Sequence, residues 1–183
     1  MAGSLIKVDE FTISSPVASV ILGGGRSGSS GLNASIDSTY DVYMVKINGL
    51  SPDTAENLEC RVTESGTANT TANYDFAGKG LKTSGAFENN SGTNATQWDI
   101  SDSFINATTG NFNAVIYIFN ANNSGEYTFI TFETSHYAGA ELYGNQGGAV
   151  FTSTSSVNGL LFQIDSSNNI DAGQFVLYGL KNS

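Results

Sequence analysis

The sequence predicts an all-β fold, an antiparallel β-sandwich of the jelly-roll type, for this chain of 183 residues. Three observations predict it. The apolar residues occur in short clusters that are rich in β-branched and aromatic side chains, which suit strands. Gly, Asn, Ser and Asp, the residues typical of turns, separate these clusters. Finally, no stretch of about 12 residues combines helical periodicity with a low glycine content.

The clusters give the expected strands. Segment 57–64 alternates most clearly: Leu58, Cys60 and Val62 would point inward and the residues between them outward. Segments 40–48 and 112–119 are apolar on nearly both faces, as central strands are. The other predicted strands cover 126–133, 148–153, 159–165 and 174–180, with a weaker candidate over 17–22.

The length predicts one domain that spans residues 1–183, because domains average roughly 150 residues. The start, residues 1–11, mixes apolar side chains with charged ones and is predicted to be an N-terminal arm. Its apolar residues are candidates for contact with a partner: Leu5, Ile6, Val8 and Phe11. Residues 23–31 are rich in Gly and Ser and predict a flexible loop, and residues 84–96 predict a long polar loop.

Charge excludes several classes of function. Lys and Arg total 7 against 17 Asp and Glu, so the net charge is −10. Such a chain is repelled by a phosphate backbone and lacks the basic patch of a membrane-surface protein. The single Cys excludes an intramolecular disulfide and a multi-cysteine metal site. The longest apolar run, 115–119, is far shorter than a spanning helix, and the acids near the start argue against a signal peptide.

The residues that carry hydrolytic chemistry are few, so we predict no enzyme and no cofactor. His136 is the sole histidine and is expected to be a solvated or loop residue. Cys60 lies on the inward side of its strand, where cysteine acts as a small hydrophobic residue. Glu126 and Glu133 flank one predicted strand but, seven residues apart, would point to opposite faces.

The sole tryptophan, Trp98, lies beside Asp99 and Asp102. This grouping is compatible with a sugar platform, with a calcium site, or with a partly buried Trp at a strand end followed by Asp in a turn. Tyr137 and Tyr143 are further candidates for stacking on a glycan.

Several phrases of the sequence resemble those of a family of small virion structural proteins, mostly uncharacterised, from marine tailed bacteriophages such as cyanophages and pelagiphages. The resemblance runs through nearly the whole chain. Its phrases are the opening residues 1–10, 38–46, 61–75, 127–131, 144–148 and the ending 173–181. The family has no catalytic signature, so the resemblance assigns no catalytic residue.

The resemblance implies a late structural gene product located in the virion: a capsid decoration (cement) protein or a component of a tail fibre or knob. The alternative is a carbohydrate-binding or receptor-binding adhesin module of the phage tail, which would bind a host surface glycan. The expected partner is a major capsid or tail protein. Segments 40–48 and 112–119 expose more apolar surface than a solvated sheet face needs, which favours a homo-oligomer, and we expect a trimer.

Overall fold

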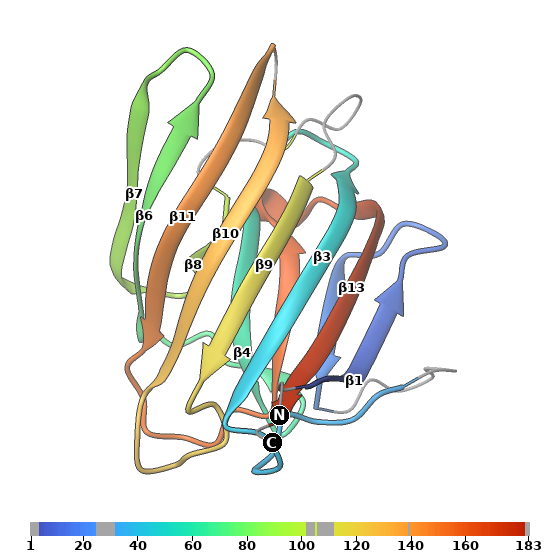
Figure 1. Ribbon diagram of the computed structural model, residues 1–183, viewed down its shortest axis with the longest axis vertical. Helices are drawn as coiled ribbons and strands as arrows, with labels where there is room; N and C mark the ends of the chain where they lie inside the picture. The colour runs from blue at the N-terminus through green and yellow to red at the C-terminus, as the bar shows by residue number, and fades with distance from the viewer. Residues whose placement is uncertain (1–3, 25–31, 102–104, 106–111, 139, 182–183) are drawn as a thin grey trace.

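The computed structural model describes residues 4–24, 32–101, 105, 112–138 and 140–181 (Figure 1). In this part of the chain, two antiparallel sheets pack together around one hydrophobic core. The predicted all-β sandwich is therefore confirmed.

The larger sheet has eight strands and lies toward the viewer in Figure 1. In spatial order they are β1 (Ser4–Thr12), β13 (Ile170–Lys181), β3 (Val42–Pro52), β9 (Phe112–Phe119), β10 (Thr128–Ala138), β11 (Glu141–Phe151), β6 (Tyr74–Lys82) and β7 (Phe87–Ala95). The smaller sheet contains β2 (Ser19–Gly23), β12 (Gly159–Ile164), β4 (Leu58–Glu64), β5 (Thr67–Ala68) and β8 (Trp98–Asp99), which pairs with β4. A short 3₁₀ turn, Asp165–Ser167, separates β12 from β13. The chain passes repeatedly from one sheet to the other, as in a jelly roll.

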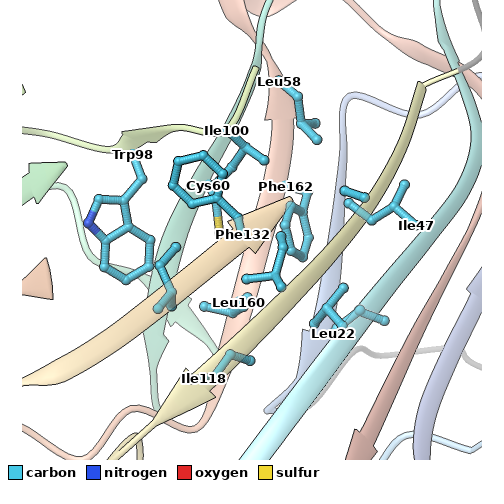
Figure 2. Packing of buried hydrophobic residues seen from close by; sticks show 14 of the residues in the cluster. Leu22, Ile47, Leu58, Cys60, Trp98, Ile100, Ile118, Phe132, Leu160 and Phe162 are labelled. Atoms are coloured by element: carbon cyan, nitrogen blue, oxygen red, sulfur yellow. The ribbon is translucent and has the colours of Figure 1, made fainter. Parts of the chain in front are cut away.

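The core forms between the inner faces of the two sheets. Along β10, every second side chain from Thr128 to His136 is buried and the residues between them are exposed, as a strand with one solvated face requires. The smaller sheet contributes Leu160 and Phe162 from β12 and Cys60 from β4 to the same core (Figure 2). Cys60 lies on the inward face, as predicted, and is fully buried.

The predicted N-terminal arm is wrong for the described residues, because Ser4–Thr12 is an edge strand of the larger sheet. It pairs with β13 from Ser4, opposite Lys181, to Thr12, opposite Gln174. Val8 belongs to the core and Phe11 packs against it, whereas Leu5 and Ile6 remain exposed. A separate arm would forgo the ladder hydrogen bonds and the burial of Val8 that pairing provides.

The predicted loop over 84–96 is also wrong, because most of it is strand β7, in a hairpin with β6. The side chains of β7 are exposed or half-buried along its whole length. Because neither face of this edge strand is buried, its sequence shows no alternation of apolar and polar residues from which a strand could be predicted. Of the predicted Gly/Ser loop 23–31, Gly23 ends β2 with a positive φ of 72°, and residues 25–31 lie outside the described residues.

Candidate functional site

The outer face of the eight-stranded sheet, which points away from the smaller sheet, is the largest candidate surface. Residues paired across neighbouring strands point to the same side, so its side chains form rows that run across the sheet. One row, which we call the apolar row, is apolar on six adjacent strands and consists of Leu5, Leu180, Val42, Phe119, Phe129 and Val150. Leu5 is 53% exposed and Phe129 44% exposed, so much of this row faces solvent.

A second row lies beside the apolar row and extends its apolar character. Tyr178 on β13, Met44 on β3 and Tyr117 on β9 are neighbours in the register. Met44 is buried by its surroundings even though it is on the outer face, whereas Tyr117 is 38% exposed. Aromatic side chains that are partly exposed in this way are frequent in contact surfaces.

The next row, which we call the charged row, carries charges of alternating sign. Across the sheet it consists of Glu10, Val176, Lys46, Val115, Glu133, Gln146 and Lys79. Gln146 Nε2 donates a 2.8 Å hydrogen bond to Glu133 Oε1, and Lys7 Nζ lies 2.7 Å from Glu10 Oε2. Negative and positive side chains therefore alternate on β1, β3, β10 and β6.

Two shallow hollows occupy the centre of this face. The first is lined by polar side chains of β3, β9 and β10, among them Lys46, Asn48, Asn113 and Ser135. The second is lined by residues that include Tyr117, Thr131 and Gln146, and both hollows share Val115 and Glu133. At the rim, Gly49 N donates a 3.1 Å hydrogen bond to Asn113 Oδ1, where the register of β3 shifts. An aromatic ring beside amides and a carboxylate is a combination that can contact a polar ligand such as a sugar.

The outer face of the smaller sheet is different, because its polar groups already bind one another. Arg61 Nη1 donates to Gln163 Oε1 at 2.9 Å and Nη2 to Gln97 Oε1 at 3.0 Å. Both glutamines donate to the carboxylate of Glu59, which is nearly buried. Burial raises the pKa of Glu59. This network uses the hydrogen-bonding groups that a ligand would need.

The predicted glycan platform is wrong, because the structure does not bring its three residues together. Trp98 is fully buried, its ring meets Tyr74 edge to face at 5.2 Å, and its Nε1 donates to Val150 O at 3.2 Å. Tyr137 is 46% exposed on the outer face, whereas Tyr143 stacks on His136 on the inner side of the sheet. Trp98 anchors the core instead, as a large aromatic ring with a satisfied N–H commonly does.

The expectation of a solvated His136 is also wrong. Its imidazole is only 3% exposed and lies between Tyr143, stacked at 5.5 Å, and Phe112 at 5.6 Å. Neither ring nitrogen has a hydrogen-bond partner among the residues that the structure describes. Burial lowers the pKa of His136 to about 4. The sequence did contain a sign of this burial. His136 lies an even number of residues from Ile130 and Phe132, so its side chain points to the same inward face of the strand.

The other candidate groups also remain apart. Burial raises the pKa of the Cys60 thiol, and Cys60 lies within the core. Glu126 precedes β10, whereas Glu133 points outward from the middle of that strand. The strand therefore does not place the two carboxylates side by side. Burial raises the pKa of Asp99, and Asp102 lies outside the described residues. Among the described ranges, no group of three His, Cys, Asp or Glu residues could hold a metal ion.

Two comparisons bear on identity, and neither assigns one: no protein-family model matches the chain, and no curated protein matches it. Within the described part of the chain, no helix has the length and apolar character needed to span a membrane.

Proposed function

We propose that this protein is a non-enzymatic structural protein of a bacteriophage virion, either a capsid decoration protein or a component of a tail fibre or knob. The observation that supports this most is the apolar row, which crosses six strands of one sheet face and stays partly exposed. Extended apolar patches on soluble domains commonly mark contacts with other proteins. The sequence resemblance to virion proteins of marine phages points the same way.

The charge of the chain agrees with this role. A structural protein assembled near packaged DNA should not bind that DNA, and a net charge of −10 repels a phosphate backbone. The partner would be a major capsid or tail protein, contacted by a homo-oligomer after synthesis in the host cytoplasm. Oligomers gain avidity when several copies engage a repetitive surface.

The burial of the reactive groups supports a role without catalysis. His136 and Cys60 are on the inner side of the sandwich, and each is packed among apolar or aromatic neighbours. A nucleophile or a general base must reach the substrate within hydrogen-bonding distance, which these positions do not offer at the surface.

The test is to measure the protein in purified particles of the phage that encodes it. Quantitative mass spectrometry of gradient-purified, salt-washed virions should detect it with the capsid and tail proteins. A copy number on the order of hundreds supports a decoration protein, and one on the order of tens supports a tail fibre component. Its absence from washed particles, with abundant protein in the infected lysate, would contradict the proposal.

The central hollows favour one alternative, a glycan-binding adhesin module that uses Tyr117, Glu133 and Gln146. In that case Tyr117→Ala and Glu133→Gln would each abolish binding to host surface polysaccharide. Tyr137→Ala, a change of an exposed ring that lines neither hollow, serves as the control. Equal binding by all four proteins would remove this alternative.

A further inference from the structure

We propose that the outer face of the eight-stranded sheet binds a second copy of this chain, face to face, about a two-fold axis that runs along β9. The inference rests on the proposed role of this face in assembly and names its occupant, and it proposes a dimer in place of the trimer that the sequence led us to expect. It depends on the order of the strands, on the signs of the charges in the charged row and on the extent of the apolar row.

The strand order makes such an axis possible. With the axis along β9, β3 of one copy lies over β10 of the other, because each is one strand away from β9. By the same count β13 lies over β11, and β1 over β6. Since the rotation axis runs along the strands, each row of side chains meets the same row of the second copy.

The charged row is complementary to itself under this rotation. Lys46 on β3 meets Glu133 of the partner subunit, and Glu133 meets the partner subunit's Lys46. Farther from the axis, Glu10 on β1 comes over the partner's Lys79, and Lys79 over the partner's Glu10. All four charged side chains of the row therefore face opposite charges, and Val115 meets its own copy on the axis.

Five of the six residues in the apolar row meet apolar residues of the second copy, and only Leu5 does not, because it comes over the partner's Asp75. Phe119 lies on the axis and contacts Phe119 of the partner subunit, Val42 faces the partner's Phe129, and Leu180 faces the partner's Val150. The partly exposed Phe129 becomes covered in this way. The apolar row would form the dry part of the interface and the charged row would fix its register.

The other two-fold axis that lies in this face runs across the strands, and the rows disfavour it. Placed at the charged row, it stacks Lys46 on Lys46 of the partner subunit and Glu133 on the partner subunit's Glu133. If this axis is placed midway between the apolar and charged rows, the apolar row of one copy contacts the charged row of the other. Like charges in contact and unpaired buried charges both cost stability.

The face is large enough for a stable dimer. Seven strands overlap about this axis, since β7 extends beyond the partner's β1, and at about 4.8 Å apart with about eight residues of about 3.3 Å each they give roughly 900 Å². A standard interface buries about 800 Å² on each partner. The aligned packing of two sheets, about 10 Å apart, is also the usual way in which sheets stack.

The test measures the mass of the purified chain by sedimentation equilibrium and light scattering at low salt. We expect a dimer at about 100 µM, where a micromolar Kd gives mostly dimer. Lys46→Glu and Glu133→Lys should each weaken it by roughly tenfold or more, because each places like charges together twice. The double variant, Lys46→Glu with Glu133→Lys, should restore the Kd to within about threefold of the original.

Asp53→Lys is the matched control, since it changes the net charge as Glu133→Lys does but lies in the exposed turn after β3. Its Kd should not change. A monomer, a trimer, or a double variant no better than the single ones would overturn the two-fold dimer. A monomer that still purifies with virions overturns only the dimer, whereas a dimer that is absent from virions overturns only the proposed function.

Discussion

The carboxylate of Asp9 joins the two sheets, because its Oδ2 accepts a 2.7 Å hydrogen bond from the backbone N–H of Gly23. Asp9 belongs to β1 of the larger sheet and Gly23 ends β2 of the smaller one. Oδ1 accepts a second bond, of 2.6 Å, from the N–H of Glu10. Asp9 is fully buried, so both oxygens have exchanged water for backbone donors.

Replacing this carboxylate should cost much of the stability of the fold. We expect Asp9→Ala to lower the free energy of unfolding by about 2–4 kcal/mol, because it removes the carboxylate acceptor of the buried Gly23 N–H and leaves a cavity between the sheets. Asp9→Asn keeps one acceptor oxygen and should lose less. Urea denaturation measures both, with Lys7→Ala on the same strand as an exposed control that should change little. Equal midpoints for Asp9→Ala and Lys7→Ala would show that the contact is dispensable.

His136 should make the fold sensitive to acid. Its pKa is about 4 when folded and 6.5 for the free group, so between these values the unfolded chain binds the proton more readily. The free energy of unfolding should therefore fall as the pH is lowered from 6.5 to 4, by at most about 3 kcal/mol. His136→Phe removes this dependence and keeps the ring packing.

The comparison of wild type with His136→Phe isolates the histidine. Burial raises the pKa of Glu59 and Asp99, so these groups stabilise the fold at low pH and lose that contribution as the pH rises. Wild type and His136→Phe both contain Glu59 and Asp99, so the contribution of these two groups cancels in the comparison. Parallel curves of unfolding free energy against pH, measured in urea between pH 4 and 7, would refute the role assigned to His136.

Trp98 should matter for stability and not for surface recognition. Trp98→Ala removes a fully buried ring and should cost about 3–5 kcal/mol. Tyr137→Ala, at an exposed ring, should cost less than about 1 kcal/mol. Thermal and urea unfolding give both values. If Trp98→Ala kept full stability, or if an added oligosaccharide quenched the Trp98 fluorescence, the core assignment would fail.

Cys60 should be unreactive in the folded protein. It is fully buried and burial raises its pKa, so the thiolate that attacks a disulfide reagent is scarce and inaccessible. We expect Ellman's reagent to modify no thiol in native buffer and one per chain in concentrated urea. Rapid modification of the native protein would contradict the inward orientation of Cys60.

The strands that contribute several apolar side chains to the core could be predicted from the sequence. The predicted strand over 112–119 matches β9, and the inward parity of Leu58, Cys60 and Val62 is confirmed, because burial imposes a period of two. Strand β1 was expected to be a separate arm, and β6, β7 and the first half of β11 were missed. The residues of the missed strands are glycine- and asparagine-rich or exposed on both sides, so nothing in their pattern separates them from loops.

The candidate site was less predictable than the strands. That β3 and β9 carry apolar residues on both faces was visible in the sequence, but the rows depend on register between strands that are distant in the chain. Lys46 and Glu133, for instance, come into one row only because both flank Val115 across two separate strand pairs. Tertiary packing decides the register between strands that are far apart in the sequence, so this register cannot be predicted from local residue patterns.

Strand β13 lies between β1 and β3 in the larger sheet (Figure 1), and Ser4 of β1 pairs with Lys181 of β13. During synthesis, β1 leaves the ribosome before β13 and has no neighbour on this side until residues 170–181 follow it. The edges of β1 and β3 that pair with β13 therefore stay open until residues 170–181 have been synthesised, and an unpaired edge is prone to join other chains. A nascent chain halted before residue 170 should consequently be protease-sensitive and bound by chaperones, and emergence of residues 170–181 should close the sheet.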